Sequence, residues 1–112
     1  VTTGGLSVDP DDMTRRALLE AGLADVLHGV PVLPGTMSLM GRIPGSPAHP
    51  GGMQVLGVPA CALYYKTTFL DLVLPRLLAG RELSRAELAR LGDGGYCLGC
   101  KICTYPKCSF GK

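Results

Sequence analysis

The hydrophobic residues fall into short runs separated by glycine and proline, and this pattern predicts a series of short strands. Four runs have the apolar or β-branched character of strands: Val1–Thr3, Val26–Val32, Met37–Ile43 and Met53–Val58. The breaks that follow them are Gly4-Gly5, Pro34-Gly35, Pro44–Gly52 and Pro59. Because the first run is so short, we interpret it as the last part of a strand whose beginning is missing.

Other segments have hydrophobic residues at helical spacing. The predicted helices are Asp9–Ala21, Ala60–Ala79 and Ser84–Leu91. Asp9-Pro10-Asp11-Asp12 has the residues that favour a helix start, and Ser84 with Glu87 is a capping-box pair. Pro75 is expected to kink the second helix. Strands that alternate with helices indicate an α/β fold.

Composition and charge exclude several classes of function. The chain has 112 residues, no Trp, and a formal net charge of +2, so neither a basic nucleic-acid arm nor an aromatic stacking platform is expected. The most apolar stretch, Ala60–Gly80, contains Lys66, Asp71 and Arg76, which argues against a membrane span. No export signal precedes the first strand, so we expect a cytoplasmic protein.

The turn after the first strand has the pattern of an anion site. Gly4-Gly5 allows a ligand to approach the backbone, and Thr3 and Ser7 add hydroxyl groups. Plain phosphate binding does not explain the nearby carboxylates, but a divalent cation bridging Asp12 to a phosphate does. The alternative is that Asp9 caps the helix and the other acids are merely solvated.

Two further breaks end apolar runs and are candidates for the same rim. Pro34-Gly35 and Gly57-Val58-Pro59 follow predicted strands, and the carboxyl ends of strands in an α/β sheet share an edge where ligands bind. Taken singly, each is more consistent with an ordinary turn.

Together these residues resemble a known family. T-T-G-G-x-S-V-x-x-D-D from Thr2 to Asp12, then Pro34-Gly35, then Gly57-Val58-Pro59 before an apolar helix, resemble the molybdopterin-binding domain of molybdenum-cofactor biosynthesis. Molybdopterin adenylyltransferase and molybdopterin molybdenumtransferase share that domain. The resemblance implies a three-layer α/β domain, with its N-terminal half missing here, that binds molybdopterin or its phosphate or adenylate with Mg²⁺.

The resemblance also implies roles for individual residues. Asp12 matches the aspartate used for metal or molybdate chemistry and is the candidate catalytic residue. The implied cofactor-binding residues are Thr3, Gly4, Gly5, Ser7, Pro34, Gly35, Gly57 and Pro59.

Departures from the family pattern favour a binding module over a complete enzyme. Thr36-Met37 stands where the transferases continue with Lys-Pro, and Ala60-Cys61-Ala62 stands where they have Gly-Asn-Pro. The missing lysine is the natural phosphate partner, and its absence disfavours turnover. An active Mg²⁺-dependent transferase is therefore kept as the alternative. Since the missing half would cover a sheet edge, we expect a preceding segment or a homo-oligomer.

The C-terminal segment carries separate chemistry. Its cysteines have the spacing C-x2-C-x2-C-x4-C, which lets thiolates share a metal centre: Cys97, Cys100, Cys103 and Cys108. An iron–sulfur cluster and a four-cysteine zinc site both fit, with disulfides or idle thiols as the alternative. A third hypothesis is therefore a small metal or electron-transfer module that acts through this tail.

The predicted organisation has three parts. Residues 1–80 are expected to form the C-terminal part of a molybdopterin-binding-like α/β domain, 81–95 a short helix and glycine-rich joint, and 96–112 a cysteine-rich metal-binding tail. Cys61 stands apart from the tail, at a predicted helix start where the pKa of a thiol can fall, although buried packing is the commoner role. Tyr64-Tyr65 is expected at the edge of the core.

Overall fold

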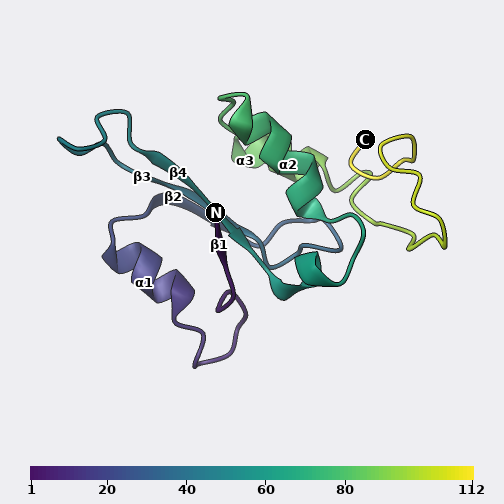
Figure 1. Cartoon of the computed structure of the whole chain (residues 1–112), viewed down its shortest axis with the longest axis horizontal. Helices are drawn as coiled ribbons and strands as arrows, with labels where there is room; N and C mark the ends of the chain where they lie inside the picture. The colour runs from purple at the N-terminus through teal and green to yellow at the C-terminus, as the bar shows by residue number, and fades with distance from the viewer. The chain divides into compact units, whose positions relative to one another are not determined.

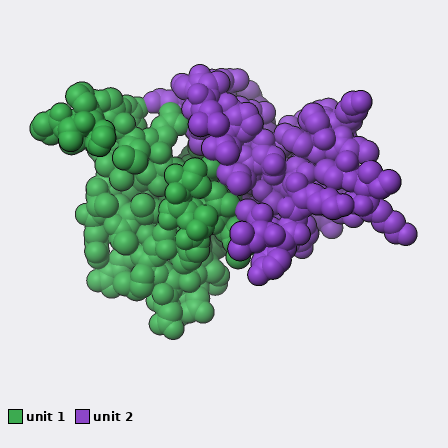
Figure 2. Space-filling model, viewed as in Figure 1, with its two compact units in different colours: residues 1–29, 37–60 green, residues 30–36, 61–112 purple.

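The computed structural model describes all residues from Val1 to Lys112. They form two compact units, coloured separately in Figure 2. Unit 1 comprises Val1–Gly29 and Met37–Ala60, and unit 2 comprises Val30–Thr36 and Cys61–Lys112. The sequence predicts boundaries at residues 80 and 95, which separate functional parts of the chain. The two compact units do not test these boundaries, so they stay a prediction.

Unit 1 is built on a four-stranded mixed sheet with the order β1-β4-β3-β2 (Figure 1). The strands are β1 (Thr2–Thr3), β2 (Ala24–His28), β3 (Leu39–Ile43) and β4 (Met53–Val58), and the helix of this unit is α1 (Thr14–Glu20). β1 runs parallel to β4, whereas the other neighbours are antiparallel. With the helices of unit 2, these elements confirm the predicted α/β class.

The observed strands agree with the prediction where glycine or proline directly ends the apolar run. β4 covers Met53–Val58 as predicted, and the loop after β3 contains the predicted glycines and prolines. The second predicted strand is too long, because Gly29 adopts a φ of +90° and ends β2 at His28. The next residues, Val30–Thr36, belong to unit 2, and the chain returns to unit 1 at Met37.

The core of unit 1 fixes the turn after β1. Leu6 is 2% exposed and packs in a cluster with Leu23, Leu39 and Val55. The carbonyl oxygen of Leu6 lies 2.9 Å from the ring nitrogen Nε2 of His28. The packing buries the Leu6 side chain, and the hydrogen bond pairs the Leu6 backbone oxygen. Both contacts hold the turn to the sheet.

The helix predicted from Asp9 begins five residues later, at Thr14. The carboxylate of Asp9 accepts a hydrogen bond from the Asp11 N–H at 3.0 Å, and the Asp9 carbonyl accepts one from the Asp12 N–H at 3.0 Å. Aspartate and proline favour tight turns as well as helix starts, and here the turn prevails. The predicted end at Gly22 is confirmed, with a φ of +93°.

Unit 2 contains α2 (Phe69–Leu78) and α3 (Arg85–Arg90). The single helix predicted over Ala60–Ala79 is wrong, since a short 3-10 helix η1 (Ala60–Leu63) precedes a break and α2 starts afresh. Thr68 caps α2: its hydroxyl accepts a hydrogen bond from the Leu70 N–H at 3.2 Å. The capping box of α3 is confirmed, with both Ser84 and Glu87 taking part.

The segment after α3 has no helix or strand but is fixed within unit 2 (Figure 1). The N–H of Leu33 donates to the carbonyl of Gly95 at 2.6 Å, and the N–H of Cys97 donates to the carbonyl of Leu33 at 2.9 Å. Near the C-terminus, Phe110 is 3% exposed and Gly111 packs against Leu72 of α2. No helix of the chain combines the length and apolar character needed to cross a membrane.

Candidate functional site

Two of the three predicted breaks leave the same edge of the sheet. Thr3 at the end of β1 pairs with Val58 at the end of the parallel strand β4. The chain then turns at Gly4-Gly5 in one case and at Pro59 in the other. The carboxyl ends of parallel strands therefore bring these turns together, at the position where α/β proteins bind ligands.

The two glycines of the first turn have different surroundings. Gly4 has a φ of +76° and nothing within 4 Å of the position where a Cβ would stand, so its backbone faces open space. Gly5 has a φ of +59°, and a Cβ there would collide with Thr14 at the start of α1. Gly4 is thus accessible to a ligand, whereas Gly5 lets the turn pack against the helix.

Asp12 faces back toward this turn. Its carboxylate oxygen Oδ2 accepts a hydrogen bond from the Ser7 N–H at 2.7 Å. The expected free amides of a helix end are not found here, because α1 begins only at Thr14 and the Ser7 amide already has a partner. What the turn offers is an open backbone at Gly4, the Ser7 hydroxyl, and a half-exposed carboxylate beside them.

The remaining predicted binding residues have packing roles. A Cβ at Gly57 would lie 2.9 Å from Cδ1 of Leu6, so this glycine makes room for the side chain that anchors the turn. Pro34 and Gly35 lie in unit 2 and are buried. The carbonyl of Pro34 accepts the Phe69 N–H at 3.0 Å, and Gly35, with a φ of +123°, lies against Phe69.

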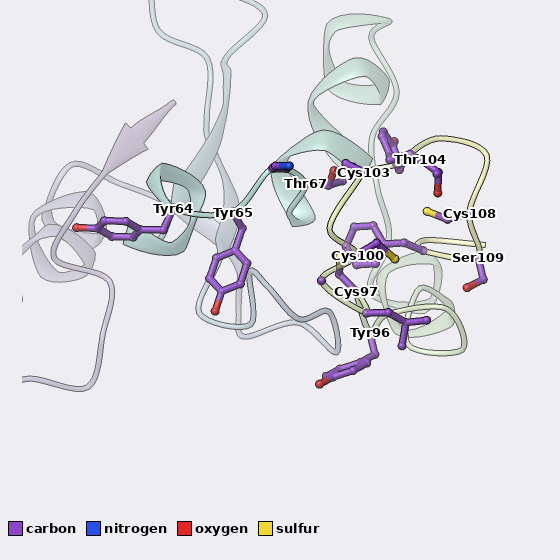
Figure 3. Close-up of a pocket in the computed structure, with 15 residues that line it drawn as sticks. Tyr64, Tyr65, Thr67, Tyr96, Cys97, Cys100, Cys103, Thr104, Cys108 and Ser109 are labelled. Atoms are coloured by element: carbon purple, nitrogen blue, oxygen red, sulfur yellow. Dashed lines mark hydrogen bonds between the residues drawn. The ribbon is translucent and has the colours of Figure 1, made fainter.

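The tail cysteines share a cavity of about 250 Å³ within unit 2 (Figure 3). Cys97, Cys100, Cys103 and Cys108 all line it, and all are free thiols. No group of three or more His, Cys, Asp or Glu side chains is placed to hold a single metal ion. The four cysteines of the sequence motif thus line one cavity, and their role as metal ligands stays a prediction.

Thr67, which no sequence motif singled out, lines this cavity and contacts one cysteine. Thr67 is 4% exposed, and its Oγ1 lies 3.1 Å from Sγ of Cys103. The Thr67 hydroxyl, followed by the Tyr105 N–H, lowers the pKa of Cys103 below its ordinary value. The signal for this position is the Thr68-x-x-Asp71 capping pattern, which ends the preceding apolar run and starts α2.

Other expectations near the cavity are corrected. Tyr64 and Tyr65 line the cavity but are 81% and 57% exposed, so they are not at the edge of a closed core. Burial raises the pKa of the Cys61 thiol, contrary to the lowering that a helix start would give, and this agrees with a packing role. Cys61 does not line the cavity.

The comparison with protein families covers most of the chain. A family model described as a probable molybdopterin binding domain matches residues 1–79. The match includes the Gly4 turn and Asp12, the Pro34-Gly35 break, and β4 with Pro59, whereas the four tail cysteines lie outside it. No curated protein and no solved structure matches the chain.

Proposed function

The chain belongs to the molybdopterin-binding domain family of molybdenum-cofactor biosynthesis, and we propose that it acts there as a binding module for molybdopterin or its phosphate or adenylate. The observation that carries this proposal is the parallel pairing of Thr3 with Val58, which places the Gly4 turn beside Pro59. A pterin phosphate fits such an edge because an exposed glycine backbone lets its oxygens approach closely.

The proposed contacts divide into direct and supporting ones. Thr3, Gly4 and Ser7 contact the phosphate with hydroxyl or backbone N–H groups, and Pro59 borders the same edge. Gly5 and Gly57 support the turn, since each makes room for a neighbouring side chain beneath it. Pro34 and Gly35 enter the proposal through the family pattern alone.

Asp12 is proposed to recruit Mg²⁺ to the phosphate. Its carboxylate is half-exposed and already oriented toward the turn by the hydrogen bond from Ser7. Mg²⁺ binds through one or two carboxylates together with substrate phosphate oxygens and retains water. When bound, the ion offsets the repulsion between the Asp12 carboxylate and the phosphate.

Calorimetric titration of the full chain with molybdopterin, with and without Mg²⁺, tests this function. Binding is expected for the wild type and a clear weakening for Asp12→Asn, which keeps an acceptor for the Ser7 N–H but removes the charge. Asp11→Asn is the matched control, because its carboxylate is a neighbour with the same charge. Absence of binding by folded wild-type protein, or equal binding by both variants, contradicts the proposal.

An active Mg²⁺-dependent transferase is the alternative at the same edge, with Asp12 as its catalytic residue. It differs from the binding module in turnover, so incubation with molybdopterin, ATP and Mg²⁺, or with the adenylate and molybdate, separates the two. The binding module predicts bound ligand without product. Thr36-Met37 in place of Lys-Pro supports the binding module.

Compartment and assembly form a further part of the proposal. Five free cysteines suit a reducing compartment, which supports a cytoplasmic location.

β1 lies at the edge of the sheet, so a second copy of the chain or a preceding segment can pair with it. Sedimentation of the protein at several concentrations distinguishes a self-associating chain from a monomer.

We also propose a metal centre in the cysteine-rich tail, holding either an iron–sulfur cluster or zinc. The observation in its favour is that all four cysteines line one cavity. Such a centre makes a small metal or electron-transfer module the second candidate function of the chain. The four cysteines belong to unit 2, whereas the residues of the pterin edge belong to unit 1.

A further inference from the structure

We infer that the cysteine cavity takes an iron–sulfur cluster rather than a single zinc ion, with Thr67 as a hydrogen-bond donor to one cluster ligand. This inference rests on the metal centre proposed above and selects its occupant. The site belongs wholly to unit 2 and includes residues from three separate stretches of the chain: 64–67, 96–100 and 103–110.

The arrangement of the thiols favours a bulky occupant. A structural zinc ion needs four sulfurs about 2.3 Å from a single point. Here the four cysteines surround a cavity of about 250 Å³, and no three of them converge to hold one ion. A cluster of iron and inorganic sulfide distributes its cysteine ligands over several metal ions, so it matches thiols that are spread around a space.

The chain positions these cysteines through contacts that do not involve the metal. The backbone of Leu33 pairs with Gly95 and Cys97, which fixes the start of the cysteine segment. The Lys66 ammonium donates to the carbonyl of Lys101 at 3.2 Å, which ties the loop between Cys100 and Cys103 to the residues before α2. These contacts fix the start and the middle of the cysteine motif without a metal.

Aromatic rings and positive charge suit a cluster in this cavity. Tyr105 and Phe110 line it with their rings packed edge to face, the centroids 6.4 Å apart. These rings give part of the lining an apolar surface, whereas Cys100 and Cys103 are exposed. Lys66 also lines the cavity, and its ammonium group favours the negative charge that thiolate ligation brings.

Thr67 provides the most specific contact. Its buried hydroxyl lies 3.1 Å from the sulfur of Cys103, and it must be the donor when that sulfur is a thiolate ligand. Hydrogen bonds to cluster sulfurs are among the factors that set reduction potentials. Because such a bond stabilises the more negative reduced cluster, Thr67 is a positioning residue that raises the potential.

Anaerobic purification of the full chain, followed by iron, acid-labile sulfide and zinc analysis, tests the occupant. The same analysis follows reconstitution with ferrous iron and sulfide. Iron and sulfide in equal amounts, with a brown thiolate–iron absorption, are expected. Cys100→Ser should lose most of the iron, whereas Cys61→Ser, the control cysteine outside the cavity, should retain it.

The other outcomes separate this inference from the metal centre on which it rests. Stoichiometric zinc in a colourless protein, or iron without sulfide, overturns the cluster but leaves a metal centre. Folded protein whose four tail thiols are all reactive and that holds no metal after reconstitution overturns both. The wild-type analysis decides between these outcomes even where a cysteine variant fails to fold.

A redox titration of the loaded protein with dithionite tests Thr67. Thr67→Val removes the hydroxyl at nearly constant shape and should shift the potential to a lower value with iron content unchanged. Thr67→Ser should restore the wild-type potential. An unchanged potential in a fully loaded Thr67→Val protein overturns the role of Thr67, since a merely structural role would alter loading or stability alone.

Discussion

The hydroxyl of Tyr105 donates a hydrogen bond to the backbone carbonyl oxygen of Asp71, over 3.3 Å. In a regular helix this carbonyl would accept the N–H of the residue four positions later. That residue is Pro75, which has no N–H but lies inside α2 without ending it. A tail residue thus satisfies an acceptor that the helix cannot, and this links the cysteine segment to α2 within unit 2.

We expect Tyr105→Phe to lower the free energy of unfolding by about 0.5–1 kcal/mol, because a partly exposed hydrogen bond is lost. The cost should shrink in a Pro75→Ala background, where the introduced alanine supplies the missing N–H. Urea unfolding of the two single variants and the double variant measures the coupling. Equal costs of Tyr105→Phe in both backgrounds would show that the hydroxyl does not compensate for the proline.

The start of α2 is a second place where one residue decides local structure. Thr68 is 3% exposed, its hydroxyl accepts the Leu70 N–H, and its own N–H donates to Oδ2 of Asp71 at 2.7 Å. Thr68→Ala should therefore destabilise the protein by about 1–2 kcal/mol. Thr68→Ser is the matched control, since it keeps the hydroxyl, and it should retain most of the stability in the same unfolding assay.

Local patterns predicted the fold where neighbouring residues decide it. The run Met53–Val58 lies between strong breaks and forms β4 as predicted, and Ser84 with Glu87 caps α3. The prediction of a single helix over Ala60–Ala79 was wrong. Apolar residues lie on both sides of the break before Thr68, so hydrophobic spacing alone does not reveal the break. At this position the Thr68 cap, rather than the hydrophobic periodicity, determines where α2 begins.

The candidate sites were predictable only in part, for a physical reason. Strand character predicted the two runs but not their pairing, which joins Thr3 to Val58, 55 residues later, and brings the Gly4 turn beside Pro59. The contact between Thr67 and Cys103 joins residues 36 apart in sequence, so no local pattern contains it. The packing of Gly35 on Phe69 is likewise a long-range contact.

Two glycines of the family pattern should respond differently to a methyl group. Gly4→Ala meets open space and costs only the strain of its positive φ, about 1–2 kcal/mol. Gly35→Ala adds a collision with Phe69 to the same kind of strain, so its cost should exceed that of Gly4→Ala by about 1–3 kcal/mol. Unfolding midpoints in urea measure both, and a reversed order would contradict the packing role of Gly35.

The capping box of α3 should make part of the stability depend on pH. The Ser84 N–H donates to Oε2 of Glu87 at 2.9 Å, and this bond, then the Ser84 hydroxyl, and then Arg81, lower the pKa of Glu87 from its ordinary value of 4.5. Because the pKa is lower in the folded state, the stabilisation is complete above that ordinary value. It is lost as the pH falls through the folded-state pKa.

Glu87→Gln tests this linkage, because the glutamine amide oxygen can accept the hydrogen bonds from Ser84 but the side chain does not titrate. Between neutral pH and about pH 3, the wild type should lose more stability than the variant, and the difference should develop below the ordinary glutamate pKa. Urea midpoints recorded across this range for both proteins provide the measurement. Parallel pH profiles would show that the capping carboxylate has the same pKa in the folded and unfolded chains.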